Sequence, residues 1–335
     1  MSKISDFQVK MKMPYEFKKA YAEIRVHEFI RECGKMEKGC IVSVGGLDSI
    51  TLLCFIRHLG YDIDGVSISS IEDKTVRAVH KMLNVIDVKP LKSKYHIVRE
   101  FGYPIFSKAI SRKMQALQNP TLNNIDYRHA ILTGETTAAA RVRNSTMVKL
   151  ADKYIDMLYN NPIPCALSDK CCIYMKEKPM NKYCTDNNVL PFLGLQASES
   201  QRRLVALSNN GCNYFNGNKS RSAPFAIFNK TDVLQLANEL NVPIPEIYGK
   251  IYVDENGIYK TTGRSRTGCD ICGFGIQFEK TRPHRFDILH DTDFKKWDFW
   301  INKMDYGKIF KHIGFKYEQP YIIGENSWIK GGETK

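Results

Sequence analysis

Four cysteines in two local pairs are the residues of this sequence with the clearest chemistry. Cys171 and Cys172 are adjacent, and Cys269 and Cys272 are separated by two residues. Two local pairs brought together by folding are a common way to build a closed site of four thiolates, which suits zinc or an iron–sulfur cluster. The sequence therefore predicts that Cys171, Cys172, Cys269 and Cys272 ligate one metal centre.

The adjacency of the first pair favours a four-iron four-sulfur (4Fe–4S) cluster, with zinc as the alternative. A single tetrahedral zinc ion normally takes ligands spaced two to four residues apart, whereas neighbouring cysteines can each bind a different iron of a cubane. Buried thiols without a metal are the other interpretation. The glycine-containing, polar residues 266–273 argue against it, because they are more typical of a ligand loop than of a core strand. The remaining cysteines, such as Cys33, Cys40 and Cys212, lack partner spacing and are expected to be packed or incidental.

A second chemical feature follows an apolar run near the N-terminus. Residues 40–43 are typical of a buried strand, residues 44–49 (Val-Gly-Gly-Leu-Asp-Ser) of a glycine turn, and the apolar residues from Leu52 to Leu59 of an amphipathic helix. Paired glycines let backbone N–H groups approach a phosphate, the helix start adds a positive dipole, and serine hydroxyls add donors. The alternative is an ordinary strand-to-helix turn with Asp48 as a helix cap. The predicted phosphate-binding residues are Ser43, Gly45, Gly46, Asp48 and Ser49.

This turn is not a Walker A loop, because the Gly-Lys-Ser/Thr ending is absent. It resembles the Ser-Gly-Gly-x-Asp-Ser pyrophosphate loop (PP-loop) of the adenine-nucleotide alpha-hydrolase superfamily, with Val44 in place of the leading serine. In that superfamily the loop holds the beta and gamma phosphates of ATP, or the equivalent phosphate of a sulfonucleotide.

Motifs further along the chain narrow the resemblance. Lys170-Cys171-Cys172-x-x-x-Lys176-x-x-Pro179 looks like a segment of cluster-bearing adenylylsulfate reductases. Gly194-x-Gln196-x-x-Glu199-Ser200-x-x-Arg203 is similar to a segment of the phosphoadenosine phosphosulfate (PAPS) reductase family, with Gln196 in place of its first arginine. Residues 102–108 and 266–275 look like the uncharacterised phage and bacterial branch of that family, which carries the Cys-Cys and Cys-x-x-Cys motifs.

The resemblance implies a set of site residues and cofactors. Gly194, Glu199, Ser200 and Arg203 are expected to join the turn in binding the nucleotide. Asp48 is expected to orient a metal ion or its waters, and Lys176 and Arg203 to neutralise phosphate or developing charge, which makes these three the predicted catalytic residues. The implied cofactors are ATP, Mg²⁺ and the 4Fe–4S cluster.

The expected activity depends on the position of the last cysteine in the sequence. Sulfonucleotide reductases of the family attack with a cysteine near the C-terminus, whereas the last cysteine here is Cys272. We therefore expect an enzyme that binds ATP and adenylates an acceptor with release of pyrophosphate, before sulfur displaces AMP. This matches, by resemblance, the cluster-containing relatives that thiolate tRNA or the DNA backbone.

Three alternatives stay open. The first is reduction of PAPS or adenylylsulfate with an unusual thiol, such as Cys212 or one from a partner. The second is a non-catalytic nucleotide-binding accessory protein. The intact residues of the two motifs argue against it, namely Gly45, Gly46, Asp48, Ser49 and Glu199. The third is an FMN adenylyltransferase, as some eukaryotic relatives are, which leaves the four spaced cysteines unexplained.

Composition indicates a cytoplasmic enzyme with a large core. The chain has 335 residues, ten cysteines and a formal charge of +13. It shows neither a signal peptide nor an apolar stretch long enough to span a bilayer, so no membrane partner is expected. The charge makes tRNA or DNA a candidate partner, with dispersed solvated surfaces as an equal alternative. A sulfur-donor or thiol protein and a homodimer are further candidates. The basic groups lie at residues 10–19, Arg112, Lys113, Arg141, Arg143, Arg202, Arg203, Arg264 and Arg266.

Alternating strand and helix patterns predict an α/β fold with an open, mostly parallel sheet flanked by helices. The expected division is an N-terminal helical extension (1–37), a nucleotide-binding domain (38–247) and a C-terminal cluster-binding, aromatic region (248–335). Helix 14–32 is expected to pack or dimerise through Phe17, Tyr21 and Ile24. Strands are expected at 62–69, 189–195 and 223–228, helices at 72–82, 107–118, 141–159 and from Thr231, and a hairpin at 248–263.

Overall fold

Two compact units make up the described part of the chain. The computed structural model describes residues 3–135, 148–265, 267–269, 272–279, 283–315 and 317. Unit 1 is formed by Met1–Pro90 and Glu177–Cys269, and unit 2 by Leu91–Lys176 and Asp270–Asn326. The predicted basic residues Arg141, Arg143 and Arg266 lie outside the described residues. Within the described ranges, no helix is long and apolar enough to cross a membrane.

These units differ from the ranges 1–37, 38–247 and 248–335 expected from the sequence. The N-terminal helices are not an appendage, because α2 (Tyr15–Lys35) buries Ala22, Val26 and Phe29 in the core of unit 1. Residues 91–176 leave the predicted nucleotide domain and share an apolar core with the C-terminal helices. Periodicity indicates which face of an element is apolar, but not which distant segment covers it.

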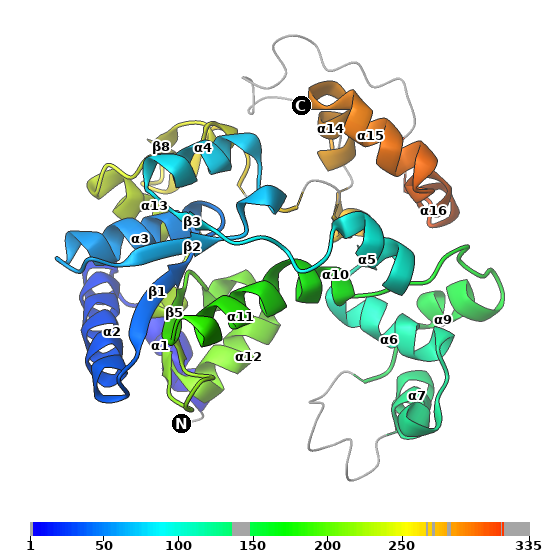
Figure 1. Cartoon of the computed structure of the whole chain (residues 1–335), viewed down its shortest axis with the longest axis horizontal. Helices are drawn as coiled ribbons and strands as arrows, with labels where there is room; N and C mark the ends of the chain where they lie inside the picture. The colour runs from blue at the N-terminus through cyan, green and yellow to red at the C-terminus, as the bar shows by residue number, and fades with distance from the viewer. Residues whose placement is uncertain are drawn as a thin grey trace. The chain divides into compact units, whose positions relative to one another are not determined.

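Unit 1 is an open, mostly parallel sheet flanked by helices, which confirms the predicted α/β fold. The strands lie in the order β3-β2-β1-β5-β7-β6, and each neighbouring pair is parallel except β6 with β7. Figure 1 shows β1 between β2 and β5, with α2 alongside. The strands are β1 (Gly39–Ser43), β2 (Asp64–Ser67), β3 (Ile86–Asp87), β5 (Val189–Leu193), β6 (Asn213–Tyr214) and β7 (Arg221–Ser222).

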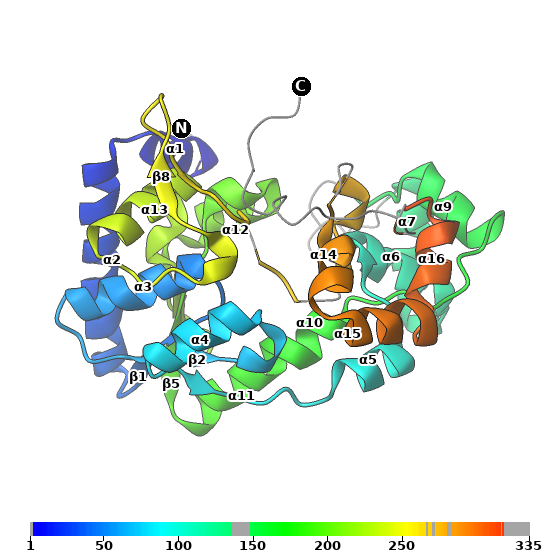
Figure 2. The ribbon, with the colours of Figure 1, turned by 90° about the horizontal axis from the view of Figure 1, so that it is seen from above.

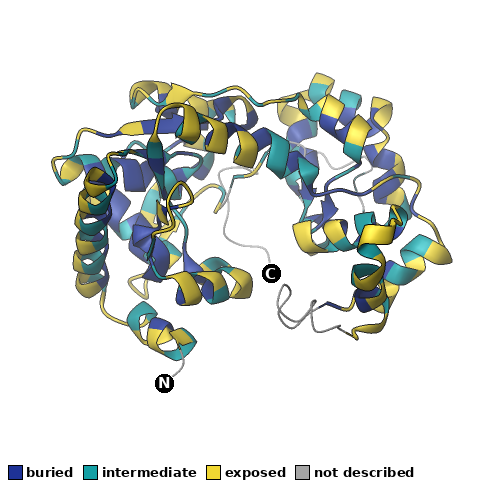
Figure 3. Cartoon of the chain, turned by 60° about the horizontal axis from the view of Figure 1, so that its bottom comes forward, coloured by how far each residue is buried: buried dark blue, intermediate teal, exposed yellow. Residues whose placement is uncertain are grey.

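Helices connect and cover these strands. The helix α3 (Leu47–His58) packs on β1 and also contacts α13, next to which it lies in Figure 2. Figure 3 shows the strands as mostly buried and the outer sides of the helices as exposed. The remaining helices and 3-10 turns are α1 (Lys3–Met11), η1 (Ser69–Ile71), α4 (Lys74–Met82), α11 (Lys178–Asp186), η4 (Ala197–Glu199), α12 (Gln201–Asn210), η5 (Pro224–Ile227), α13 (Lys230–Glu239) and η6 (Glu246–Tyr248).

Two predicted details of unit 1 need correction. The predicted face of α2 does not pack as a whole within the chain, since Phe17 is 40% and Ile24 53% exposed while Tyr21 packs against the core. A dimer through this face stays a prediction. The helix has apolar residues on more than one side, and Ala22, Val26 and Phe29 face the core instead. Residues 223–228 are not a strand, because Pro224 has no N–H to donate to a sheet ladder, and Pro224–Ile227 form the 3-10 turn η5 instead. The predicted hairpin is confirmed by β8 (Ile251–Val253) and β9 (Tyr259–Thr261).

Unit 2 consists of helices around a small parallel pair of strands, β4 (Ile105–Phe106) and β10 (Gly273–Phe274). The aromatic residues Phe286, Trp297 and Trp300 of the C-terminal segment are buried in its core. Helix 107–118 is confirmed as α6, and helix 141–159 only over α9, since 136–147 lie outside the described residues. The elements are α5 (Lys94–Phe101), α6 (Lys108–Gln118), η2 (Leu122–Asn124), α7 (Ile125–Thr133), α9 (Asp152–Tyr159), α10 (Lys170–Cys172), the π-helix η3 (Ile173–Glu177), η7 (Ile276–Phe278), α14 (Arg285–Thr292), α15 (Phe294–Asp298), the π-helix η8 (Phe299–Lys303) and α16 (Tyr306–His312).

Candidate functional site

The glycine turn after β1 lies where the order of the sheet reverses. From β1 the chain continues to β2 on one side of the sheet, and from β5 it continues toward β7 on the opposite side. The loops that follow the adjacent strands β1 and β5 therefore lead in opposite directions. Ser43 at the end of β1 is aligned with Leu193 at the end of β5. Open parallel sheets bind ligands in the crevice at such a switch point. The predicted residues on these two loops therefore share one edge of the sheet.

Hydroxyl groups hold the backbone of the turn. The amide of Gly45 donates to Ser49 Oγ at 2.7 Å, and the same hydroxyl donates to the carbonyl of Gly46 at 2.9 Å. The amide of Leu47 donates to the Tyr248 hydroxyl at 3.1 Å. The helix N-cap is Gly46, with extended backbone, and Asp48 lies inside the first turn. Asp48 is therefore not the helix cap that the alternative interpretation expected, and the phosphate-binding role of the turn stays a prediction.

Two glycines allow close approaches that a larger residue would block. A Cβ atom on Gly46 would lie 2.4 Å from the Tyr248 hydroxyl oxygen and 3.0 Å from Thr267 Oγ1. A Cβ atom on Gly194, directly after β5, would lie 2.9 Å from the Ser49 amide nitrogen and Cα. The loop after β5 thus packs against the first turn of α3, which places the predicted residue Gly194 beside Asp48 and Ser49.

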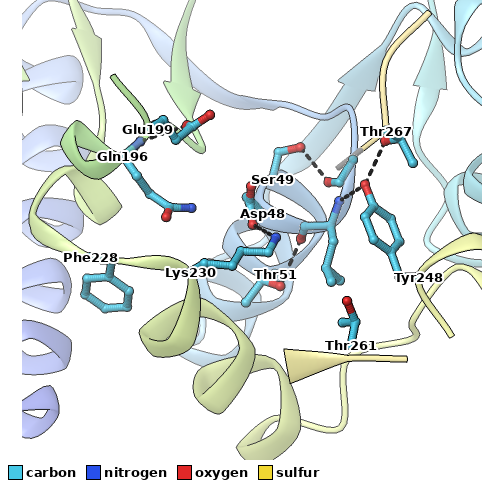
Figure 4. A network of polar contacts seen from close by, with 12 residues as sticks. Asp48, Ser49, Thr51, Gln196, Glu199, Phe228, Lys230, Tyr248, Thr261 and Thr267 are labelled. Atoms are coloured by element: carbon cyan, nitrogen blue, oxygen red, sulfur yellow. Dashed lines mark hydrogen bonds and ion pairs between the residues drawn. The ribbon is translucent and has the colours of Figure 1, made fainter. Parts of the chain in front are cut away.

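Lys230 is a site residue that the sequence analysis missed. Its Nζ atom lies 2.6 Å from Asp48 Oδ1, and both side chains are partly exposed (Figure 4). Lys230 opens α13, whose start is fixed by a capping box between Asn229 and Asp232. The pair places a cation and an anion at the opening of α3. No local motif indicates this contact, because the partners are 182 residues apart in the sequence.

His80 on α4 is a second missed residue. Its side chain is 2% exposed, with Nε2 2.8 Å from the Gly45 carbonyl oxygen and Nδ1 3.2 Å from Ser69 Oγ. A carbonyl can only accept, so Nε2 carries the proton and Nδ1 accepts from the Ser69 hydroxyl. Burial lowers the pKa of His80, which favours the neutral ring. His80 thus holds the Gly45 carbonyl of the turn by a hydrogen bond and adds no charge to it.

The second predicted motif follows β5. Ser200 caps α12 by accepting from the amide of Arg203 at 3.3 Å, and the Arg203 guanidinium forms an ion pair with Glu199. The Glu199 carboxylate also accepts from the amide of Gln196 at 3.4 Å. Arg203 further lines a cavity of about 100 Å³ between α12 and the strands β5 to β7. The structure therefore shows Arg203 paired with Glu199, while its predicted contact with a phosphate stays a prediction.

Two buried polar atoms near this edge have no hydrogen-bond partner among the described residues. Gln196 is 2% exposed and its Nε2 is unpaired, and Ser67, at the end of β2, has an unpaired Oγ. In Figure 4 the Gln196 side chain extends from the loop after β5 toward Asp48 and Lys230. Ser67 ends β2 and Gln196 lies on the loop after β5, and these two strands flank β1.

Cys212 lies at the same cavity as Arg203 and is almost fully buried. Burial raises the pKa of its thiol to about 11. At neutral pH the thiol form therefore predominates, and the thiol is a weak nucleophile. Cys33 is packed in the core and Cys40 is packed against it, as expected for cysteines without partner spacing. A hydrogen bond between them lowers the pKa of Cys33 and raises that of Cys40.

In unit 2 one short stretch pairs with both cysteine-bearing segments. Tyr103 forms a parallel bridge with Leu167, shortly before Cys171 and Cys172, while Ile105 in β4 pairs with Gly273, which directly follows Cys272. A Cβ atom on Gly273 would lie 2.5 Å from the carbonyl oxygen of Pro104, so this pairing requires glycine. The stretch from Tyr103 to Ile105 thus brings the segments of three predicted metal ligands together.

The first cysteine pair continues directly into the π-helix η3. Pro179 in the first turn of α11 has no N–H, so the carbonyl of Met175 cannot receive the usual helical hydrogen bond. Such π-helical turns are frequent at functional sites. Lys176 lies in η3 within unit 2, whereas Asp48 and Arg203 belong to unit 1. Its catalytic role stays a prediction.

The four-cysteine centre also stays a prediction. Cys171, Cys172 and Cys272 belong to unit 2, and Cys269 is the last residue of unit 1 before Asp270. Among the residues that the structure describes, no group of three or more His, Cys, Asp or Glu side chains is placed to hold a metal ion.

Comparisons with known proteins find similarity among solved structures alone. No protein-family model and no curated protein matches the chain. Among solved structures, the phosphoadenylyl-sulfate (PAPS) reductase from Candida auris, in its phosphate complex, is similar with a TM-score of 0.35 and 12% sequence identity. The match covers 74% of this chain and 98% of that chain. At this TM-score and identity, the likeness carries no argument about function.

Proposed function

We propose that the chain is a PP-loop enzyme of the PAPS reductase family that binds ATP and adenylates an acceptor for sulfur transfer, with nucleic acid as the acceptor. The observation that carries this proposal is the glycine turn at residues 44–49, which opens α3 at the switch point of a parallel sheet. Helix N-termini at such positions bind phosphate groups through backbone amides and the helix dipole. The motifs of the sequence support the choice of family.

The contacts of the turn suit a phosphate. The amides of Gly45 and Leu47 donate to hydroxyl oxygens, and a phosphate oxygen would take the place of these hydroxyls as the acceptor. Lys230 adds a cation that can move from Asp48 to a phosphate oxygen. Asp48 then becomes free to orient Mg²⁺ or its waters.

The unpaired Gln196 Nε2 and Ser67 Oγ support a ligand at the same edge. A buried polar group without a partner costs about 1–3 kcal/mol of stability. A nucleotide with ring nitrogens and ribose hydroxyls offers acceptors and donors for both atoms. We therefore place the nucleoside between the ends of β2 and β5 and the phosphates at the turn.

The chemistry follows from this placement. An acceptor oxygen attacks the alpha phosphorus of ATP, an acceptor–phosphorus bond forms, and the bond to the departing pyrophosphate breaks. Amides of the turn and Lys230 stabilise the charge on pyrophosphate, and Mg²⁺ would share this role. A sulfur nucleophile later displaces AMP from the acceptor.

Cys171, Cys172, Cys269 and Cys272 would hold the 4Fe–4S cluster, with zinc as the alternative metal. The pairing of Tyr103 with Leu167 and of Ile105 with Gly273 supports a shared site, because it joins the segments of both pairs. Such a cluster supplies an exchangeable sulfide or a rigid cross-link. The high pKa of Cys212 argues against this residue as the nucleophile of a sulfonucleotide reductase.

The test is calorimetric binding of ATP, PAPS and adenylylsulfate to protein purified without oxygen. We expect tight binding of ATP, followed by pyrophosphate release when tRNA or DNA is added. Lys230→Met should weaken ATP binding about tenfold, as expected for loss of one charge-assisted hydrogen bond. Lys219→Met, at an exposed lysine between β6 and β7, is the matched control and should have no effect. Tight binding of a sulfonucleotide with weak binding of ATP would replace this proposal with a reductase that uses an external thiol.

A further inference from the structure

One side of α4 carries three basic residues that the proposed chemistry at the glycine turn does not use. Lys74, Arg77 and Lys81 are exposed, and their spacing of three and four residues places them on one face of the helix. The helix itself contains no acidic residue. Among the residues that the structure describes, none forms an ion pair or a side-chain hydrogen bond with these three. This basic face of α4 is therefore a local concentration of positive charge that the chain does not neutralise.

Other basic residues of the chain are held by carboxylates. Four of those that the sequence analysis singled out form ion pairs with an aspartate or a glutamate, namely Lys18, Lys19, Arg112 and Arg203. An ion pair lowers the attraction of such a residue for a further anion. The basic face of α4 was not among the expected basic groups, yet its cations are the ones left available.

The positions of these cations also oppose the stability of the helix. Lys74 and Arg77 lie in the first turn of α4, where the helix dipole favours carboxylates and disfavours cations. The N-cap Asp73 does not compensate, because its carboxylate accepts from the amide and the hydroxyl of Thr75, at 2.8 and 2.7 Å. A local rule that is broken without a compensating contact points to function. A bound anion would be attracted by these cations and by the helix start together.

α4 is joined to the glycine turn near both of its ends. His80 Nε2 lies 2.8 Å from the Gly45 carbonyl oxygen. Near the helix start, Thr75 Oγ1 accepts from the amide of Ile247 at 3.2 Å, directly before the tyrosine whose hydroxyl contacts the turn. At about 100° per residue, the basic face lies about 90° around the helix axis from His80. The turn and the basic face are therefore separated by a distance on the order of one helix diameter, about 10 Å.

We propose that the basic face of α4 binds the phosphate backbone of the nucleic acid that accepts AMP. This inference rests on the proposed function and names where its acceptor docks. Contacts to phosphates fix the position of a strand without reading its sequence. A strand held on α4 then has to extend around only one helix to bring an acceptor atom to the nucleotide at the turn.

The dimensions of the basic face suit a nucleic acid better than a small metabolite. From Lys74 to Lys81 the helix rises about 10 Å, a length over which duplex DNA carries about six phosphate charges. The small side chain of Ala78 is exposed between the cations and allows a close approach of the backbone. An acidic protein would instead need a large apolar anchor at the centre of its contact. The large apolar residue here is Met82, which is 68% exposed and lies at the end of the helix.

The test compares two triple variants of the full chain that remove the same positive charge. Glutamine replaces each cation, because it keeps much of the side-chain length and is a good helix former. The first variant carries Lys74→Gln, Arg77→Gln and Lys81→Gln. The matched control changes three exposed cations of α2 and of the connection between β6 and β7, namely Arg31→Gln, Lys35→Gln and Lys219→Gln.

Fluorescence anisotropy gives the affinity of each protein for a labelled short DNA duplex and for a labelled tRNA, over a series of salt concentrations. Polyglutamate is the probe for an acidic polypeptide. Calorimetry gives the affinity for ATP, and thermal unfolding shows whether each variant is folded. We expect the α4 variant to bind the nucleic acid that the wild type prefers about tenfold or more weakly. Its slope of log affinity against log salt should be smaller by about three, because each phosphate contact contributes about 0.9. The control should keep the wild-type slope, and both variants should keep the wild-type affinity for ATP.

An α4 variant with wild-type affinity for nucleic acid and an unchanged salt slope would overturn the inference and leave the proposed ATP chemistry intact. Equal weakening by the control would also overturn it, because the charge of the whole surface would then be responsible. Tighter binding of polyglutamate than of either nucleic acid would make an acidic protein the occupant and overturn it as well. A protein that binds nucleic acid through α4 but does not bind ATP would contradict the proposed function alone.

Discussion

The two glycines of the β1 turn have different neighbours, so their roles can be separated by mutation. A Cβ atom on Gly46 would collide with the Tyr248 hydroxyl, whereas one on Gly45 would find its nearest neighbour, Glu72 Oε1, at 3.7 Å. Gly46→Ala should therefore destabilise the protein by about 1–3 kcal/mol through overpacking, while Gly45→Ala should leave stability nearly unchanged.

Both variants should lose affinity for ATP, because both add a methyl group to the turn that we propose for phosphate. Chemical denaturation and calorimetry measure the two effects. Unchanged ATP affinity in Gly45→Ala would contradict a phosphate site at this turn.

The buried His80 makes the turn sensitive to acid. Its pKa in the folded protein is lowered by burial, so below about pH 6.5, the ordinary pKa of histidine, the unfolded chain binds a proton more readily than the folded one. The stability that the neutral ring contributes is thus complete above about pH 6.5 and is lost as the pH falls toward the lower folded pKa. His80→Gln keeps a donor for the Gly45 carbonyl but cannot titrate. Its unfolding temperature should fall less than that of the wild type between pH 7.5 and 5, and parallel curves would argue against this role.

At the scale of elements, a buried ion pair fixes the start of α13 against α2. Lys18 Nζ lies 2.8 Å from Asp232 Oδ2, with both side chains buried, whereas the neighbouring pair of Lys19 and Glu239 is partly exposed. Breaking a buried pair leaves an uncompensated charge, so Lys18→Met should destabilise the protein by about 3 kcal/mol.

Lys19→Met should cost less than about 1 kcal/mol, because an exposed pair contributes little. Denaturant unfolding of the two variants gives the comparison. Since Lys230 opens the same helix, Lys18→Met should also weaken ATP binding. Equal stability losses at the two positions would contradict a special role for the buried pair.

Helices and strands that are marked by local sequence patterns were predictable, whereas the distant residues that contact them were not. The β1 strand, its glycine turn and α3 follow from apolar spacing and paired glycines, and the start of α13 follows from its capping residues. Lys230 and Tyr248 reach the turn from 182 and 201 residues away, so no spacing rule identifies them. The face of α2 that packs within the chain was not predictable for the same reason, because the neighbours of the helix are set by the tertiary fold.

At the scale of the whole molecule, unit 2 is assembled from two distant segments of the chain. Residues 91–176 supply β4, while the C-terminal segment supplies β10 and the buried Phe286, Trp297 and Trp300. Neither segment has a complete core of its own. A chain that ends at Cys269 should therefore keep amide protection in β1 and β5 and lose it in α5 and α6, as measured by hydrogen exchange.

A control chain with the single change Gly268→Ala should retain protection throughout, because nothing lies within 4 Å of a Cβ atom at that position. Wild-type protection of α6 in the truncated chain would show that residues 91–176 fold without the C-terminal segment.

The centre of the unit 1 sheet has a consequence for synthesis in the cell. β1 pairs with β5, yet residues 44–188 lie between the two strands, so one edge of β1 has no partner until most of the chain has left the ribosome. An apolar strand with an open edge invites pairing with other nascent chains. Pairing of β1 with β5 is also slow, because the chain loses conformational entropy in bringing these distant segments together before any stabilising contact forms. Slower translation at low temperature, or more chaperone, should therefore raise the yield of correctly folded protein.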